Sequence, residues 1–244
     1  MTLVWSPGYA PVDEYYDNVS LLLYGNGTNG STTITDNSPT PKTVTAVGNA
    51  QISTAQSKFG GASMLFDGNG DYLTASSNAG FAFGTGDFTV ETWARPTTLS
   101  TGYDYAMVFD TRAVAVPPNP GILVAFTNAT GVWIFYESVA NTITNTSSSA
   151  VVNQWQHVAL SRAGTAWKFF VDGAQVGTWT NGSNLGTSQP LLIGTARDNP
   201  GSDRNFPGYI DDLRITKGVA RYTSNFIPPT ESFPDLSPTG RLAL

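Results

Sequence analysis

The chain of 244 residues contains no cysteine and only one histidine, His157. These absences exclude disulfides, thiolate catalysis and cysteine-held zinc, and they leave no second imidazole for a histidine-rich metal site. Charged residues are also scarce, at 12% of the sequence, which is about half of the usual share in a soluble domain. Serine, threonine, asparagine and glycine therefore provide the solubility, and this composition favours strands and turns over long exposed helices.

Basic clusters and long apolar runs are missing as well. The net charge is −6 and no run of lysine or arginine occurs, so we expect no nucleic-acid surface. No apolar run approaches the roughly 20 residues that span a bilayer, so we expect no membrane insertion. Residues 1–11 lack the basic and apolar regions of a signal peptide, and we therefore expect synthesis in the cytoplasm.

The sequence divides into three zones. Residues 1–16 form an arm whose aromatic residues suit docking onto a partner, because aromatic side chains dominate interface energetics. These docking candidates are Trp5, Tyr9, Tyr15 and Tyr16. Residues 17–233 form the main domain, and the proline-punctuated tail of residues 234–244 should be extended rather than helical.

Short strand signals fill the central zone. Apolar or alternating segments are separated by turn residues, and the expected strands are residues 19–24, 42–47, 62–66, 72–75, 88–95, 121–126, 132–136, 155–162, 167–171, 175–180, 191–196 and 209–216. Asp67–Gly70 and Asp172-Gly173 both predict hairpin turns, the second of type I′. The best helical candidate is one turn at Val219–Tyr222. No repeat of fixed period occurs, so the pattern predicts an all-β sandwich or closed barrel rather than a propeller.

Several motifs resemble one family in their order and spacing. They are residues 57–63 (SKFGGAS), 66–68 (FDG), 71–73 (DYL), 86–93 (GDFTVETW), 155–159 (WQHVA), 171–173 (VDG), 208–215 (GYIDDLRI) and 217–222 (KGVARY). Together they resemble the laminin-G-like, concanavalin A-like jelly-roll domains found in phage and bacterial surface proteins. The resemblance covers roughly residues 17–233 and implies a two-sheet antiparallel jelly roll that often binds carbohydrate or mediates adhesion.

Three loops are the best candidates for ligand binding. Residues 97–105, 111–120 and 197–206 are long for a compact β domain, and long loops are often functional. The charged candidates in or beside them are Asp110, Arg112, Arg197, Asp198, Asp203 and Arg204. Sugar sites combine such groups with aromatic faces. The alternative is that these loops are merely solvated.

Two adjacent aspartates suggest a metal site. Asp211 and Asp212 lie in an expected strand, where alternation would send them to opposite faces. The family resemblance implies a structural calcium between a late-strand aspartate and the N-terminal segment, where Asp17 or Asn18 could contribute oxygen ligands. The alternative is that an aspartate caps a turn or pairs with Arg214 or Arg95.

Catalysis is not expected from this chain. Concanavalin-like glucanases use two carboxylates close together on one strand, and retaining chemistry needs them about 5–5.5 Å apart. Glu91 is the only acid on its expected strand, and Thr89 and Trp93 occupy the positions two residues away. His157 has no serine or aspartate partner at a suitable position, which favours a structural histidine.

The leading functional hypothesis is a non-enzymatic phage virion surface protein, a head or tail decoration with adhesive potential. Its partners would be other virion proteins, further copies of itself and a host-surface glycan. The alternative is a carbohydrate-binding module of an extracellular or cell-surface protein, and a glycoside hydrolase is the least favoured reading.

Overall fold

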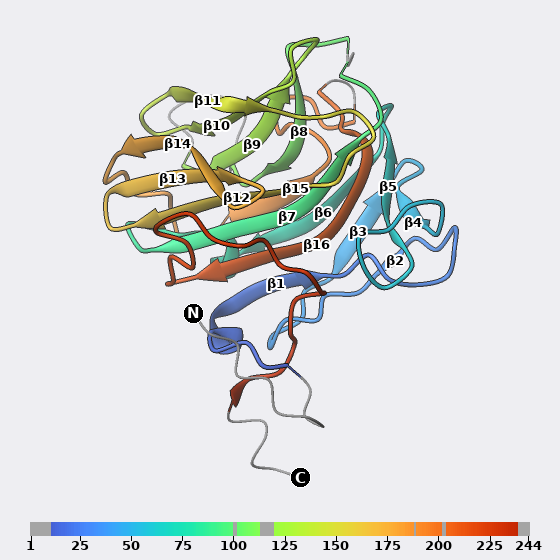
Figure 1. Cartoon of the computed structure of the whole chain (residues 1–244), viewed down its shortest axis with the longest axis horizontal. Coiled ribbons are helices and arrows are strands. Elements are labelled where there is room, and N and C mark those ends of the chain that lie inside the picture. The colour runs from blue at the N-terminus through green and yellow to red at the C-terminus, as the bar shows by residue number, and fades with distance from the viewer. Residues whose placement is uncertain (1–10, 100–101, 113–119, 188, 202–203, 239–244) are drawn as a thin grey trace.

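The structure is a computed structural model that describes residues 11–99, 102–112, 120–187, 189–201 and 204–238. Two eight-stranded antiparallel sheets pack face to face as a sandwich (Figure 1). The described residues include two short 3₁₀ turns, η1 (Tyr16–Asn18) and η2 (Ala79–Phe81). Within the described ranges no helix has the length and apolar character needed to cross a membrane. The all-β sandwich predicted from the sequence is confirmed.

Sheet A forms the front layer in Figure 1 and lies partly under the C-terminal segment. Its strands, in spatial order, are β14 (Ala174–Thr180), β13 (Ala166–Val171), β12 (Gln156–Ala163), β7 (Phe88–Pro96), β16 (Pro207–Lys217), β5 (Ser63–Asp67) and β4 (Gln51–Ser53). The eighth strand, β1 (Val19–Leu23), pairs with the second half of β16. The long strand β16 therefore exchanges one neighbour for another along its length.

Sheet B forms the second layer. Its strands, in spatial order, are β11 (Thr142–Ser149), β10 (Val132–Glu137), β9 (Ile122–Thr127), β8 (Tyr105–Asp110), β15 (Gln189–Ile193), β6 (Tyr72–Asn78), β3 (Val44–Val47) and β2 (Thr33–Ile34). The sequence pattern did not predict β8, β11, β2 or β4. Strand β11 is built from serine, threonine and asparagine with one isoleucine, so it lacks the apolar alternation on which strand prediction depends.

The core lies between the inner faces of the two sheets and is rich in aromatic rings. Phe88 and Trp167 of sheet A pack edge to face at 5.3 Å between ring centroids, and Phe135 of sheet B stacks on Trp167 at 6.2 Å. Phe126 contacts Trp133 at 5.6 Å. All five side chains are fully buried, and each contributes roughly 1.5–3 kcal/mol of apolar burial.

One of the two predicted hairpins is confirmed and the other is wrong. Asp172 and Gly173 both have positive φ (49° and 77°) and join β13 to β14 with Val171 opposite Ala174, as a type I′ hairpin requires. Asp67–Gly70 instead links β5 in sheet A to β6 in sheet B. The turn crosses between the layers because each flanking strand pairs with other strands.

The lateral edges of the two sheets approach each other on both sides of the sandwich. On one side the outer strands β11 and β14 are in contact, and Ser147 Oγ donates to the carbonyl of Val176 at 3.2 Å. On the other side the loop before β2 exchanges backbone hydrogen bonds with Ile52 of β4. The sandwich is therefore nearly closed, like a flattened barrel.

The segment after β16, residues 219–233, crosses the outer face of sheet A, and we call it the strap (Figure 1). The single helical turn predicted at Val219–Tyr222 is wrong, since these residues form bends and irregular structure. Tyr222 stacks on Phe226 at 3.6 Å, and Phe226 packs against Phe170 of β13 at 5.3 Å. The aromatic rings of the strap thus cover β12 and β13, and packing rather than helix propensity fixes its path.

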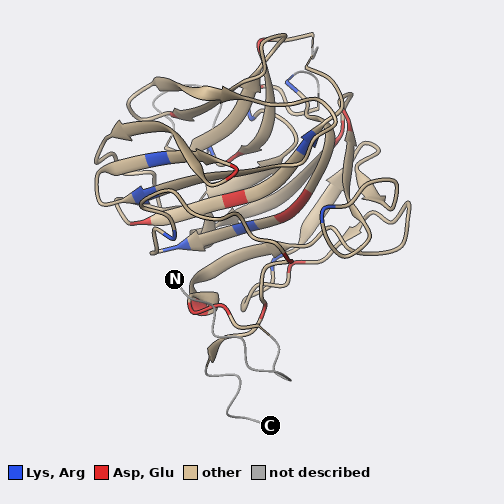
Figure 2. Ribbon diagram, in the orientation of Figure 1, with Lys and Arg blue, Asp and Glu red and all other residues tan. Residues whose placement is uncertain are grey.

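A buried ionic network lies beneath the strap. Glu91 of β7 accepts hydrogen bonds from Arg214 Nε and an Arg214 terminal nitrogen at 2.9 and 2.8 Å, and from the Tyr222 hydroxyl at 2.7 Å. Asp13 accepts from Arg214 at 3.0 Å and from Arg221 at 2.7 Å. Figure 2 shows the charged residues of β7 and β16 within the front sheet. The network joins both chain ends to sheet A.

This network also determines the charge state of Glu91. Burial alone would raise the pKa of Glu91, but Arg214, His157 and Arg221 outweigh burial and hold the pKa well below its usual range. The His157 Nε2 atom lies 3.3 Å from the Glu91 carboxylate. Glu91 is therefore an ionised structural carboxylate, and the residue is 1% exposed.

Replacing Arg214 with methionine should destabilise the domain strongly, because buried Glu91 would lose both guanidinium hydrogen bonds and Asp13 would keep Arg221 alone as its cationic partner. We expect a loss of about 3–5 kcal/mol in the free energy of unfolding, measured by urea denaturation. The double variant Glu91→Gln/Arg214→Met should lose less than the sum of the single variants. Arg204→Met is the matched control. It removes a half-buried ion pair with Asp198 and should lower the free energy of unfolding by about 1 kcal/mol or less. Additive losses in the double variant would contradict the coupling.

Candidate functional site

The outer face of sheet B carries an apolar surface with two tyrosines. Its buried floor consists of Met107, Leu123, Ala125, Ile134 and Ala196. Tyr105, Val132 and Tyr136 pack on this floor and remain partly exposed. We call these eight residues the sheet B surface. Seven of the eight residues belong to the paired strands β8, β9 and β10, and Ala196 follows β15, so the tyrosine rings stand on a rigid support.

A chain of ion pairs borders the sheet B surface. Arg112 donates through Nε and a terminal nitrogen to Asp110, with distances between 2.6 and 3.0 Å. The same guanidinium reaches Asp198 at 3.1 Å, and Asp198 accepts from Arg204 at 3.1 Å. The Arg112 guanidinium also lies 5.8 Å from the centre of the Tyr136 ring. Charged donors and acceptors therefore stand beside an aromatic face.

Most of the predicted ligand residues come together at this border. Asp110 ends β8, while Arg197 follows shortly after the neighbouring strand β15, and the Arg197 backbone N–H donates to Asp110 at 2.8 Å. The Arg197 side chain bonds to the Arg112 carbonyl at 3.1 Å. Asp203 lies outside the described residues. Asp110 is fully buried and serves the scaffold, so Asp198 and Arg204 are the more accessible members.

The three aspartates predicted to share calcium do not gather. Asp17 is exposed in η1, and the described residues hold no group of three acidic, histidine or cysteine side chains with metal-binding geometry. Asp211 accepts from the backbone N–H groups of Lys58 and Phe59 at 2.7 and 3.1 Å. Asp212 accepts from the Phe233 N–H at 2.9 Å. These oxygens hold protein segments in place and do not form the expected donor set, while calcium binding as such stays a prediction.

The expected alternation of Asp211 and Asp212 is wrong because β16 contains a bulge there. Trp93 lies opposite Asp211, and Glu91 lies opposite Arg214, so β16 has one residue more than β7 between the paired positions. Asp212 occupies the left-handed region with φ 44°, a conformation that aspartate tolerates better than most residues. The bulge lies where β16 changes its neighbour from β5 to β1.

Burial dominates the protonation of both aspartates. It raises the pKa of Asp211 to about 7 despite three backbone hydrogen bonds, and it raises the pKa of Asp212 to about 7 with a further contribution from the Asp211 charge. The folded chain therefore holds protons that the unfolded chain releases near pH 4. As the pH rises toward 7 and above, ionisation of the two aspartates lowers the free energy of unfolding.

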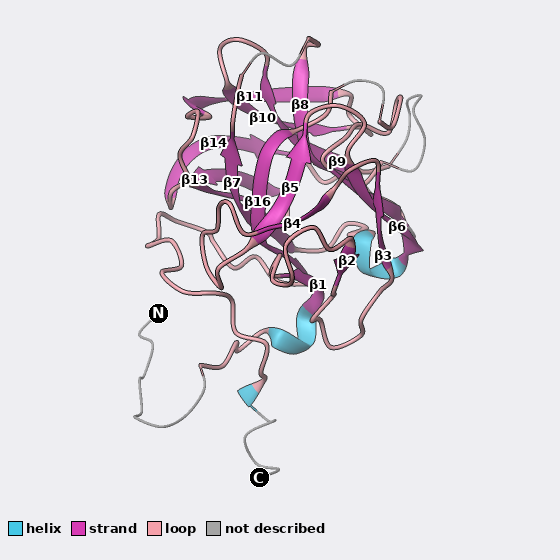
Figure 3. Cartoon of the chain, turned by 90° about the vertical axis from the view of Figure 1, so that its right-hand side faces the viewer, coloured by secondary structure: helices cyan, strands magenta, loops and turns pink. Residues whose placement is uncertain are grey.

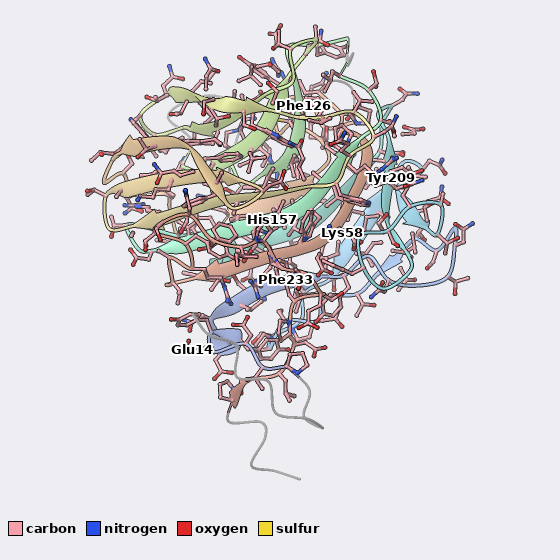
Figure 4. The ribbon with its side chains drawn as sticks, in the orientation of Figure 1. Glu14, Lys58, Phe126, His157, Tyr209 and Phe233 are labelled. Carbon is pink, nitrogen blue, oxygen red and sulfur yellow. The ribbon has the colours of Figure 1, made fainter. Side chains whose placement is uncertain are left out.

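Glu91 and His157 do not form a catalytic site with the predicted ligand residues. Both side chains are buried beneath the strap, where His157 lies 6.4 Å from the Tyr222 ring and 6.4 Å from the Phe233 ring (Figure 4). Sequence reasoning did not identify Arg214 and Arg221 as the partners of Glu91. The only signal was the unusual frequency of charge within the strand at residues 211–214.

The docking tyrosines of the arm are partly used within the domain. The Tyr16 hydroxyl donates to the Asn37 carbonyl at 2.7 Å, and the ring packs with Val19, Leu22 and Phe233. Tyr15 lies beneath the Arg221 guanidinium at 5.4 Å. Trp5 and Tyr9 lie outside the described residues. The arm predicted as residues 1–16 is thus already packed on the domain at Asp13–Tyr16.

Stability should fall as the pH rises from about 4.5 to 8, because the raised pKa values of Asp211 and Asp212 give the native state extra protons in this window. Asp212→Asn keeps an acceptor for the Phe233 N–H. The loss in free energy of unfolding between these pH values should be smaller in this variant by on the order of 2 kcal/mol. Urea unfolding followed by tryptophan fluorescence at several pH values measures the slope. Asp17→Asn, at an exposed position, should leave it unchanged, and an equal slope in Asp212→Asn would contradict the assignment.

Comparisons with known proteins agree with this architecture. The solved structures that resemble it include domain 4 of AbnA, a GH43 extracellular arabinanase from Geobacillus stearothermophilus, in complex with arabinotriose; the TM-score is 0.60 at 16% identity, over 83% of this chain and 94% of that domain. The binding domain of Paraclostridial Mosquitocidal Protein 1 matches with a TM-score of 0.60 at 16% identity, over 84% of this chain and 50% of that one. The botulinum neurotoxin serotype D binding domain matches with a TM-score of 0.60 at 15% identity, over 84% of this chain and 49% of that one.

The chain spans about half of each toxin binding domain, and at these identities the likeness shows the fold alone. No curated protein matches the sequence. The family described as Concanavalin A-like lectin/glucanases superfamily, Laminin_G_3, matches residues 67–221. Because this match covers more than half of the sequence, the chain belongs to the concanavalin A-like lectin/glucanase superfamily.

Proposed function

We propose that the protein is a non-enzymatic carbohydrate-binding domain that recognises glycan on the sheet B surface. The observation that carries this proposal is the position of Tyr105 and Tyr136, partly exposed on a rigid sheet beside the ion-pair chain of Arg112, Asp198 and Arg204. Sugar rings present apolar C–H faces and peripheral hydroxyl groups. A site for them therefore combines aromatic faces with polar groups of fixed orientation.

The polar groups at this border are held in place before any ligand arrives. Asp110 fixes Arg112 by bidentate bonding, and the Tyr136 hydroxyl donates to the Asn141 side chain at 2.8 Å. Preorganised groups of this kind lose little conformational entropy on binding. The similarity in fold to an arabinanase domain solved with arabinotriose supports a saccharide as the ligand class.

The absence of catalysis is part of the proposal. Glu91, the strand acid considered for hydrolysis, accepts hydrogen bonds from Arg214 and Tyr222 beneath the strap. Its pKa lies well below the usual range, whereas a general acid in glycoside hydrolysis needs a raised pKa. The Glu91 carboxyl group is therefore suited to holding the strap and not to donating a proton to a glycosidic oxygen.

Replacing Tyr136 with alanine should weaken glycan binding at least about tenfold, because the sugar would lose its aromatic platform. A glycan array identifies the ligand, and calorimetry with that ligand measures the affinity. Ile227→Ala removes an apolar side chain that is 87% exposed on the strap and serves as the control. Unchanged affinity in Tyr136→Ala, with the fold intact by circular dichroism, would remove the sheet B surface from consideration.

The setting that we propose for this domain is the surface of a phage virion, with a bacterial cell-surface protein as the alternative. The described terminal segments, residues 11–16 and 234–238, lie at the same end of the domain, away from β8–β11 (Figures 1 and 3). The Asp13 N–H donates to the Leu236 carbonyl at 2.9 Å, which joins the two terminal segments. Attachment through this end to other virion proteins, or to a second copy of the chain, would leave the sheet B surface free.

Removing residues 1–10 should prevent attachment to the particle without unfolding the domain, because Asp13 and its ion pair with Arg214 remain. Co-sedimentation of tagged protein with intact phage particles, from a lysate of the infected host, measures attachment. Full-length protein should sediment with particles and the shortened chain should stay in the supernatant. Equal sedimentation of both would show that the arm is not the anchor.

A further inference from the structure

A second candidate surface lies on the outer face of sheet A, next to the region that the strap covers. We call it the sheet A patch, and it consists of Lys58, Phe59, Trp93, Arg95 and Tyr209. Trp93 and Arg95 are two residues apart on β7 and so share a face. Tyr209 lies opposite Arg95 on the neighbouring strand β16. Figure 4 shows Tyr209 toward one end of the sheet, with Lys58 between Tyr209 and Phe233 of the strap.

Both cations of the patch rest on aromatic rings. The Lys58 ammonium lies 3.8 Å from the centre of the Trp93 ring and 5.5 Å from that of Phe59. The Arg95 guanidinium lies 5.8 Å from the centre of the Tyr209 ring. Lys58, Phe59, Arg95 and Tyr209 are all partly exposed. The rings hold the cations at the surface without neutralising them.

Lys58 and Arg95 differ from the other cations of the described chain. Every other described lysine or arginine side chain donates to a carboxylate, a carbonyl or a hydroxyl oxygen. Lys168 and Lys217, for example, bond to the carbonyls of Thr223 and Ala79. In the described residues Lys58 and Arg95 have no such acceptor, although the net charge of the chain is −6. Two unpaired cations on one patch therefore favour an anionic partner.

The patch also contains an unused buried donor and no available acid. Trp93 is 5% exposed, and its Nε1–H has no acceptor in the described structure. A buried donor without a partner needs an explanation, and a bound water or ligand is one of the explanations. Asp211 lies opposite Trp93, but it is fully buried and already accepts from three backbone N–H groups. No carboxylate of the patch is thus free to pair with Lys58 or Arg95.

We propose that the sheet A patch binds an acidic saccharide, with the sugar carboxylate between Lys58 and Arg95 and the sugar ring against the aromatic side chains. Two cations near aromatic faces match a ligand that carries charge and an apolar ring face together. A nucleic acid is a poorer match, because the rest of the chain offers no basic track for further phosphates. The inference extends the proposed carbohydrate-binding role to a second site on the opposite sheet.

The double variant Lys58→Gln/Arg95→Gln tests this site on a glycan array that displays neutral, carboxylated and sulfated glycans. Wild-type protein should bind carboxylated glycans, and the variant should bind them at least tenfold more weakly. Raising the salt from 50 to 500 mM should weaken wild-type binding as well, because salt screens charge pairs at the surface. Lys168→Gln/Lys217→Gln changes the net charge equally at carbonyl-bonded lysines and should leave binding unchanged.

The outcomes separate this inference from the proposed function. Loss of binding to neutral glycans in Tyr136→Ala tests the sheet B surface. Loss of binding to carboxylated glycans in Lys58→Gln/Arg95→Gln tests the sheet A patch. Urea denaturation should show that each variant is folded. Absence of carboxylated glycans among the wild-type ligands, retention of them by the double variant, or selective binding of sulfated glycans or of a DNA duplex would each overturn the assignment.

Discussion

The ion pair between Glu91 and Arg214 is the interaction on which the arrangement of sheet A depends. Both side chains are almost fully buried, and such a pair persists only when hydrogen bonds satisfy both charges. Asp13 supplies one of those bonds from the N-terminal side, and Tyr222 supplies another from the strap. Segments from the two ends of the sequence must therefore be in place before the charges are satisfied, which couples the chain ends to the centre of the sheet.

This coupling also divides the molecule by role. The strap covers the part of sheet A nearest the network. Its rings pack on β12 and β13 and stabilise that part of the sheet. The outer face of sheet B keeps two tyrosines partly exposed. The sheet A patch begins beside the last residue of the strap, since Phe233 donates to Asp212 and the adjacent Asp211 lies opposite Trp93. The two proposed binding surfaces thus lie where the structural network does not reach.

The sequence predicted the fold class well and the connections between strands less well. Alternating apolar residues marked β7, β12 and β16, whereas β11 was missed because its position at a sheet edge places little demand on apolar side chains. The Asp67–Gly70 turn was recognised as a turn, but turn chemistry does not specify which strand each arm pairs with. Charged residues in two long loops predicted Asp110, Arg112 and Asp198 as one group, and the structure brings them together because β8 and β15 are paired where both strands end. The buried network was not predictable, since it joins residues up to 208 positions apart.

The contacts of β11 with β14 and of the β2 region with β4 affect how one copy of the chain can meet another. An uncovered edge strand offers unpaired N–H and C=O groups to any neighbouring chain, and this is how sandwiches polymerise or aggregate. Here each edge faces its own opposite sheet. Copies of the chain can therefore come close together without adding strands to one another.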